Sequence, residues 1–316
     1  MSDERELLRQ TVAALVDKHA SAEAVRAAME SERGYDEALW QLLCEQVGAA
    51  ALVVPEDFGG AGGDLADAAV VLAELGKALV PTPLLGTTLA ELALLSAAEP
   101  DGPTLERLAA GESIGTVVFD ADYVVNGDLV GPDDVVVAAD GGRLTRCGRV
   151  ETTPAHTMDP TRRLGRVTVH DSEPLGPDPG LADYAAILLA AEQLGAAQRC
   201  LELTVDYTKS RVQFGRPIGS FQALKHRMAD LYVAVSAAHA VVGDAIAAPS
   251  PTAAALARVT ASEAFSQVAG EAIQLHGGIA ITWESDIQLY FKRAHGSSQL
   301  LGRPAEHLRR LEAEVF

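Results

Sequence analysis

Residues 207–222 read Tyr207-Thr-Lys-Ser-Arg211-Val-Gln-Phe214-Gly-Arg-Pro-Ile-Gly-Ser-Phe-Gln222, and this stretch joins two long helical patterns. The glycines and the proline turn the chain, so Arg211 is expected at the C-terminal end of one helix and close to the beginning of the next. A guanidinium fixed beside a helix N-terminus is suited to binding a pyrophosphate. Taken alone, an ordinary helix hairpin with an exposed arginine explains the stretch equally well.

A second stretch, Gln274-Leu-His-Gly277-Gly278-Ile-Ala-Ile-Thr-Trp-Glu284, follows a further helical pattern. A glycine pair after a helix allows a ligand to approach the backbone closely. A carboxylate six residues later could act as a base. Taken alone, a glycine that ends the helix and a surface glutamate explain this stretch better.

The sequence on both sides of these motifs is helical in its apolar spacing. We expect three long helices at 182–211, 220–247 and 252–276, with Ser220 capping the second, and shorter ones at 284–293 and 304–314. The connectors are short, which predicts antiparallel neighbours in a bundle.

The chain before this bundle divides into a helical part and an extended part. Helices are expected within the first hundred or so residues, at 36–47, 65–79 and 84–97 among others, around the glycine-rich loop that begins Pro55-Glu-Asp-Phe-Gly-Gly60. From Ser113 the pattern becomes strand-like, with turns predicted at Asn126-Gly127 and Asp140-Gly-Gly142. The prediction is an α+β, mostly α fold with domains at 1–112, 113–180 and 181–316.

Together the two motifs resemble the C-terminal domain of the acyl-CoA dehydrogenase family, and the loop at 55–60 resembles that family's N-terminal domain. The resemblance covers nearly the whole chain. It implies an N-terminal helical domain, a middle β domain and a C-terminal four-helix bundle. It also implies an FAD cofactor and α,β-dehydrogenation of an acyl-CoA thioester, with electrons passing to an electron-transfer acceptor.

The same resemblance assigns roles to individual residues. Glu284 matches the position of the catalytic base in many members. Ser297-Ser-Gln299 occupies the place of a further flavin-contacting tripeptide. Arg211, Phe214 and Gln222 match residues that hold the ADP half of an FAD whose flavin is seated in the neighbouring subunit. Another stretch of the family along the same cofactor is matched by Gln274, Gly277 and Gly278.

The chain also departs from the family pattern. The β region is short and lacks the Thr-Glu-Pro-x-x-Gly-Ser-Asp loop that holds the flavin, and Ala185 and Ala186 stand where the family places a substrate-facing arginine or an alternative base. The chain therefore resembles the short, partly degenerate subunit of heterotetrameric actinobacterial enzymes of steroid-catabolism type. That resemblance implies a full-length homologue as partner in an α2β2 assembly, and it favours a Glu284 that is present but idle.

Two other functions remain open at this point. The chain could be a self-sufficient homo-oligomeric dehydrogenase with Glu284 as its base. It could also be a helical scaffold without a cofactor, but that function leaves both glycine-flanked motifs unexplained.

The composition and the spacing of cysteine and histidine residues restrict the classes of function that remain. The 316 residues include 44 acidic and 25 basic ones, a net charge of −19, which disfavours binding to nucleic acid. The three cysteines form no CxxC pair, and His156, Asp159 and His170 match no ligand spacing, so no metal site is expected. The charged N-terminus and the short apolar stretch 231–242 predict neither a secretory signal nor a membrane span. We expect a cytoplasmic protein.

Overall fold

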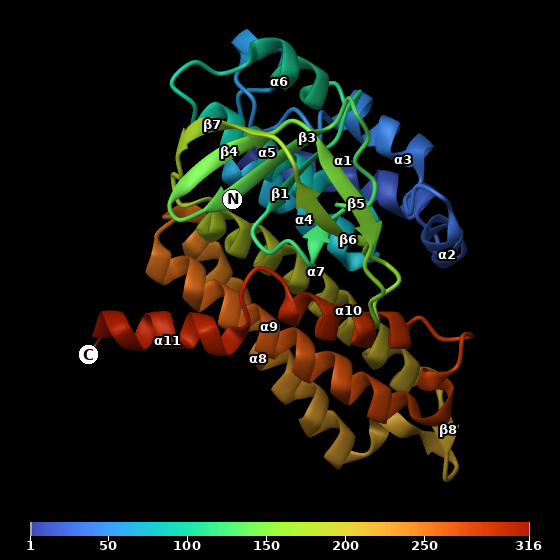
Figure 1. Ribbon diagram of the computed structural model, residues 1–316. Helices are drawn as coiled ribbons and strands as arrows, with labels where there is room; N and C mark the ends of the chain where they lie inside the picture. The colour runs from blue at the N-terminus through green and yellow to red at the C-terminus, as the bar shows by residue number, and fades with distance from the viewer. Residues whose placement is uncertain (1, 316) are drawn as a thin grey trace.

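The computed structural model describes residues 2–315 and has helical, β and helical parts in that order (Figure 1). This order confirms the predicted fold class. The first part consists of the helices α1 (Asp3–His19), α2 (Ala22–Glu30), α3 (Glu37–Leu42), η1 (Leu43–Val47), η2 (Glu56–Phe58), α4 (Leu65–Lys77), α5 (Leu84–Leu95) and α6 (Gly102–Ala109). The last part consists of the helices α7 (Leu181–Ser210), η3 (Ile218–Ser220), α8 (Gln222–Ala247), α9 (Pro251–His276), η4 (Gly277–Ile281), α10 (Ile287–Gln299) and α11 (Pro304–Val315).

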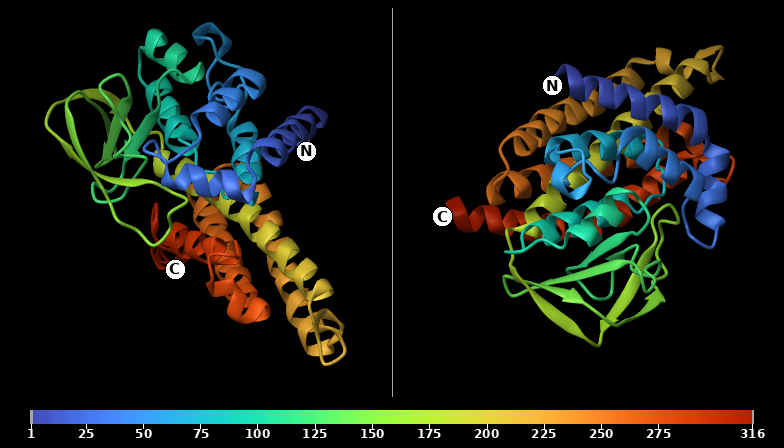
Figure 2. Two further views of the ribbon diagram at one scale, coloured as in Figure 1. Left: turned by 90° about the vertical axis from the view of Figure 1, so that its right-hand side faces the viewer. Right: turned by 90° about the horizontal axis from the view of Figure 1, so that it is seen from above.

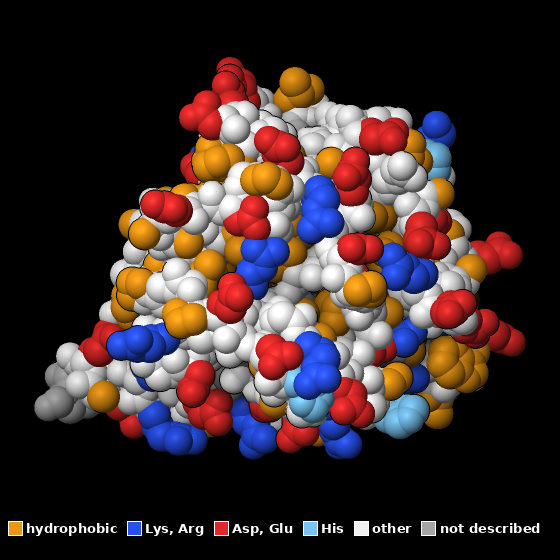
Figure 3. Space-filling view, turned by 45° about the horizontal axis from the view of Figure 1, so that its top comes forward, with side chains coloured by type: hydrophobic (Ala, Val, Ile, Leu, Met, Phe, Trp, Pro, Cys, Tyr) orange, Lys and Arg blue, Asp and Glu red, His pale blue; other side chains and the backbone are white. Residues whose placement is uncertain are grey.

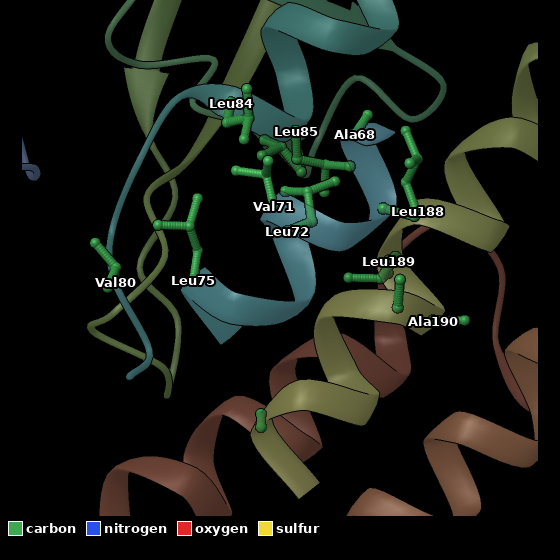
Figure 4. Packing of buried hydrophobic residues seen from close by; sticks show 14 of the residues in the cluster. Ala68, Val71, Leu72, Leu75, Val80, Leu84, Leu85, Leu188, Leu189 and Ala190 are labelled. Atoms are coloured by element: carbon green, nitrogen blue, oxygen red, sulfur yellow. The ribbon is translucent and has the colours of Figure 1, made fainter. Parts of the chain in front are cut away.

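The two helical parts share one core where α4 crosses α7. The buried side chains of α4 and α5 pack together and face those of α7, as Figure 4 shows for Leu72, Leu85 and Leu188. At the crossing the backbones almost touch. A Cβ atom on Gly195 would lie 1.9 Å from the carbonyl oxygen of Ala73, and one on Gly76 would lie 2.3 Å from that of Glu192. Both positions therefore require glycine.

The middle part contains two small sheets (Figure 2), one of which packs against α5. One sheet has the strand order β1-β3-β4-β7 and the other has the order β2-β6-β5. The strands are β1 (Gly115–Val118), β2 (Val124–Val125), β3 (Val135–Asp140), β4 (Arg143–Cys147), β5 (Val150–Pro154), β6 (Leu164–Val169) and β7 (Ser172–Pro177).

Two features of the sheets differ from the sequence-based expectation. Asp140-Gly-Gly142 does form the tight turn of the β3–β4 hairpin, with both glycines at positive φ. Asn126-Gly127 forms a turn as well, but the strand before it pairs with β6, and β1 pairs with β3 in parallel. Pro174 and Pro177 lie within β7, which no local pattern predicted as a strand; β7 is at a sheet edge, where prolines cost no ladder hydrogen bond.

Two helices also begin at other residues than the sequence predicted. Ser220 does not cap α8, because its hydroxyl donates to the carbonyl oxygen of Pro217 at 2.7 Å and α8 follows Phe221. Glu284 does not begin the next helix, because α10 starts at Ile287 and Ser285 accepts the Ile287 N–H at 3.3 Å.

Helix α8 is longer and more apolar than the stretch 231–242 suggested. By length and composition alone it could cross a membrane, although helices of soluble bundles meet the same criteria. In this fold α8 packs along α9 and α7, with Leu231, Val235 and Val242 turned inward. On the face of the molecule shown in Figure 3, acidic and basic side chains are interspersed.

Candidate functional site

The Arg211 motif forms a small hairpin that projects from the end of the bundle (Figure 2). Its strands are β8 (Val212–Gln213) and β9 (Arg216–Pro217), and its turn places Phe214 and Gly215 at positive φ. The Phe214 side chain is 91% exposed, and its ring lies edge-on to the ring of Phe221, with centroids 6.2 Å apart. A strained turn that presents a phenyl ring to solvent is typical of a surface that binds another molecule.

The two sequence motifs meet at this end of the bundle. The Tyr207 ring stacks on the His276 ring with centroids 4.2 Å apart, and the Tyr207 hydroxyl donates to the His276 carbonyl oxygen at 3.3 Å. His276 Nδ1 lies 2.9 Å from the carbonyl oxygen of Ala272, which can only accept, so Nδ1 carries the proton. Burial lowers the pKa of His276, which keeps this ring neutral. The contact joins the ends of α7 and α9.

The residues at this end suit the phosphates of a dinucleotide. Within residues 2–315, the Arg211 guanidinium forms no ion pair, and Gln222 and Gln274 are exposed. A Cβ atom on Gly277 or Gly278 would have no neighbour within 4 Å, so another molecule can approach this backbone closely. A guanidinium, amide side chains and open backbone are the groups that bind a pyrophosphate, and the ADP half of FAD therefore fits here.

Glu284 lies in the exposed loop between η4 and α10, at the same end of the bundle as the motifs. Its neighbour Trp283 is 64% exposed, and Lys292 Nζ lies 4.6 Å from the centre of the indole ring. The Glu284 carboxylate accepts no hydrogen bond from any described residue. Its catalytic role stays a prediction.

A cavity of about 890 Å³ lies at the opposite end of α10. Helix α10 has 13 residues, so about 20 Å of helix separates the two ends. Gln299 of the predicted flavin-contacting tripeptide lines this cavity, but Glu284 and the six residues predicted to contact FAD do not. Ala185 and Ala186 do not line it either, because both are fully buried within α7.

A buried ion cluster, which we define as Asp159, Arg162, Glu192 and Arg293, lies between the cavity and α7. Arg293 Nε is 2.9 Å from an Asp159 carboxylate oxygen, and Arg293 Nη1 is 2.5 Å from a Glu192 oxygen. Arg162 pairs with the same Glu192 oxygen. The cluster joins the loop before β6 to α7 and α10, so it fixes the β part on the bundle. Glu192 is therefore a structural, hydrogen-bonded carboxylate.

The charges of this ion cluster determine its pKa values. Burial by itself would raise the pKa of Glu192, but the guanidinium groups of Arg162 and Arg293 outweigh burial and lower it. Burial by itself would lower the pKa of Arg293, but Asp159 and Glu192 outweigh burial and raise it. At Arg162, by contrast, burial outweighs the nearby carboxylates and lowers the pKa. Asp159 serves as the ion-pair partner of Arg293.

The two helical parts match known families. Residues 2–112 match the family model described as acyl-CoA dehydrogenase, N-terminal domain, and residues 181–315 match the C-terminal domain. Acyl-CoA dehydrogenase IpdE2 of Mycobacterium tuberculosis is 70% identical over 99% of this chain and 98% of that protein. The chain belongs to the acyl-CoA dehydrogenase family. IpdE2 of Mycolicibacterium smegmatis is 71% identical over the full length of both chains.

Solved acyl-CoA dehydrogenase structures share this fold. The Tcur3481–Tcur3483 steroid ACAD is similar with a TM-score of 0.90 and 27% identity, over 99% of this chain and 98% of that chain. A chain of the ChsE4–ChsE5 complex from Mycobacterium tuberculosis gives a TM-score of 0.90 at 24% identity, over 100% of this chain and 98% of that chain, which shows the fold alone.

One residue near the cavity in this acyl-CoA dehydrogenase chain was not singled out from the sequence. Arg258 is fully buried in α9 and has no carboxylate partner among residues 2–315. Its signal in the sequence is a charged residue directly after an alanine-rich run, Ala253 to Ala257.

Proposed function

We propose that this chain is one subunit of an FAD-dependent acyl-CoA dehydrogenase that acts in the cytoplasm on an acyl-CoA thioester of steroid-catabolism type. In this proposal the chain contributes the ADP-binding half of an FAD site shared with a partner subunit. The partner is a full-length homologue in an α2β2 complex, and an electron-transfer acceptor reoxidises the cofactor.

The observation that carries this proposal is the separation of the ADP-type residues from the cavity. Arg211 and the open backbone of Gly277 face outward on an exposed end of the bundle. The cavity lies beyond the other end of α10, about 20 Å away by helix length. A dinucleotide on the hairpin is therefore best placed to serve a flavin site on another chain.

The residues have separate roles in this proposal. Arg211 neutralises pyrophosphate charge, and Gln222 and Gln274 offer amide donors to the ADP half. Gly277 and Gly278 let the cofactor approach the backbone. FAD, when bound, supplies the hydride acceptor for the dehydrogenation.

The exposed face of α8 supports the presence of a partner subunit. Tyr232 and Val233 are 67% and 64% exposed, and alanines at 229, 237 and 240 lie on the same exposed side. A long helix that presents this much apolar surface is a typical protein interface. The heteromeric names of similar structures, Tcur3481–Tcur3483 and ChsE4–ChsE5, agree with such a partnership.

We propose further that Glu284 is not the base of this enzyme and that the partner subunit supplies it. A base must lie within hydrogen-bond reach of the proton that it removes. Glu284 stands on an exposed loop and lines no part of the cavity, so a thioester in the cavity is out of its reach.

Co-expression of this chain with a full-length homologue tests the proposal. We expect a yellow α2β2 complex with two FAD per four chains, and we expect this chain alone to retain no FAD. A homo-oligomer of this chain that binds one FAD per protomer would instead establish the self-sufficient dehydrogenase.

A further inference from the structure

A second cavity, which we call the small cavity, lies where the three parts of the chain meet. It lies between α4, the β part, α7 and α10, which come together in Figure 1. Its volume is about 20 Å³. A cavity of about 10–15 Å³ or more can hold one water molecule, so only a ligand of that size fits here. Its polar lining includes side chains from each part of the chain: Thr82 in the α4–α5 connector, Asn126 in the turn after β2, and Arg162, Glu192 and Arg293 of the ion cluster.

Asn126 gives this lining an acceptor without a partner. Its backbone is fully bonded, because its N–H donates to the Arg163 carbonyl oxygen at 2.9 Å and its carbonyl oxygen accepts the Leu129 N–H at 3.0 Å. The residue is 5% exposed, and its buried Oδ1 has no hydrogen-bond partner among the described residues. Burying an amide oxygen without a partner is costly, so a donor is expected beside it.

Arg162 gives the same lining a donor without a partner. It is 9% exposed and its Nη2 donates to the Glu192 carboxylate, but its buried Nε has no partner within residues 2–315. Arg293 pairs with Asp159 as well as with Glu192, so Arg162 is the less compensated of the two. Burial accordingly lowers the pKa of Arg162, although Glu192 opposes this effect. An acceptor at Nε would reduce the cost of burying this guanidinium.

The small cavity therefore requires a group that accepts one hydrogen bond and donates another. A cation cannot accept the Arg162 Nε–H, and it would be repelled by the guanidinium groups of Arg162 and Arg293. Chloride can accept that N–H, but it cannot donate to Asn126 Oδ1, and the Glu192 carboxylate would repel it. Water both accepts and donates. A buried water typically makes about three hydrogen bonds, and Thr82 offers a further hydroxyl on the same lining.

We propose that the small cavity binds one ordered water molecule, which accepts the Arg162 Nε–H and donates to Asn126 Oδ1. The ion cluster joins the loop before β6 to α7 and α10, and this water extends the same network to the turn after β2. The water thus helps to fix the β part on the helices. Asn126 and Arg162 are not among the residues predicted to contact FAD, so the site does not depend on the cofactor or on the partner subunit.

A high-resolution crystal structure of the full chain, grown in chloride, tests the site. We expect one electron-density peak in the small cavity, about 2.7–3.2 Å from both Asn126 Oδ1 and Arg162 Nε. Data collected at long wavelength distinguish the two candidate occupants, because chloride scatters anomalously there and water does not. We expect no anomalous signal at this peak.

Two substitutions of Asn126 separate its side chain from its backbone conformation. Asn126 has a φ of 56°, which glycine adopts without strain, so a purely conformational role predicts that Asn126→Gly is at least as stable as the unsubstituted protein. We expect instead that its urea midpoint falls by about 0.5 M, because the acceptor for the water is lost. Asn126→Asp is the matched control. It keeps an oxygen acceptor and tolerates the same φ, so it should retain the water and a midpoint above that of Asn126→Gly.

Four results would overturn the proposal: no peak in the small cavity, a peak with the anomalous signal of chloride, a direct hydrogen bond between Asn126 and Arg162, or an Asn126→Gly protein as stable as the unsubstituted one. A peak without anomalous signal that bridges both residues, together with a lower urea midpoint in Asn126→Gly than in Asn126→Asp, would establish it. The crystal structure of the unsubstituted chain decides the presence of the water even if Asn126→Gly fails to fold.

Discussion

Arg293 and Arg211 show how differently one residue type is used within a single bundle. The guanidinium of Arg293 is enclosed, with Asp159, Thr161 and Glu192 accepting its N–H groups. The guanidinium of Arg211 stands at the base of an exposed hairpin and has no ion-pair partner in the described chain. An arginine whose donors are all used holds the chain together, whereas one whose donors face outward is available to a ligand.

The first prediction concerns the enclosed arginine and has the largest expected effect. Arg293→Met leaves Asp159 without a counter-ion and leaves Glu192 with Arg162 alone. Removing one partner from a buried ion cluster typically costs about 3–5 kcal/mol. We expect a loss of that size in the free energy of unfolding, measured by urea denaturation. Arg309→Met, at an exposed position, is the control, and a loss below about 1 kcal/mol in Arg293→Met would show that the cluster contributes little.

The second prediction concerns the outward-facing arginine. Arg211→Ala should weaken FAD retention in the assembled complex by about one to two decades, because a charge-assisted hydrogen bond contributes about 1.5–3 kcal/mol. The complex is dialysed against buffer without FAD, and the absorbance of the flavin that remains bound measures this retention. Thermal stability should not change. Lys209→Ala removes a neighbouring exposed charge and is the matched control. Unchanged FAD affinity in Arg211→Ala would reject its assignment to the pyrophosphate.

Glu91 is a third case: its side chain is enclosed like that of Arg293, but in the described chain its carboxylate has no hydrogen-bond partner. It is fully buried in α5, and neither carboxylate oxygen has a hydrogen-bond partner within residues 2–315. Burial raises the pKa of Glu91 well above its ordinary value of 4.5. The folded protein therefore binds this proton more tightly than the unfolded chain, so stability is complete below about pH 4.5 and falls as the pH rises toward the folded pKa.

The third prediction follows from the raised pKa of Glu91. Glu91→Gln cannot ionise, so its stability advantage over the unsubstituted protein should be absent near pH 4.5 and should grow with pH. The slope of the difference can reach about 1.4 kcal/mol per pH unit. Urea midpoints across this pH range measure it, with the exposed Glu45→Gln as control. A constant difference at all pH values would mean that Glu91 finds a partner.

The fourth prediction has the smallest expected effect. Glu284→Gln in the complex should change turnover by no more than about threefold at unchanged FAD content, since the residue is exposed and remote from the cavity. General-base catalysis typically contributes 10²–10⁴-fold. A thousandfold loss would therefore identify Glu284 as the base and would overturn the assignment of that role to the partner.

The helices and the two motifs could be predicted from the sequence because their signals are local. The apolar spacing at 65–79 predicted a helix, and the structure has α4 (Leu65–Lys77) there with Val71 and Leu72 buried. The turn at Asp140-Gly-Gly142 was equally clear, because paired glycines permit the positive φ values that a tight hairpin needs. The motif ends of α7 and α9 also lie together, joined by Tyr207 and His276.

What the sequence did not reveal depends on distant partners. Strand β4, Arg143–Cys147, reads as a mixed polar segment, and only its pairing with β3 and β7 makes it a strand. Arg293 lies 134 residues from Asp159 and 101 from Glu192, so no local pattern predicts their cluster. The cap predicted for Ser220 failed because its hydroxyl found a nearer acceptor in Pro217.

The close crossing of α4 and α7 has a consequence for how this chain can change over generations. Any side chain at Gly76 or Gly195 would collide with a carbonyl of the other helix. These two positions should resist substitution as strongly as a catalytic residue would, although they touch no ligand. A related chain can lose the flavin-binding loop and part of the β region. It cannot change the N-terminal helices independently of the bundle, because the two are in backbone contact at these glycines.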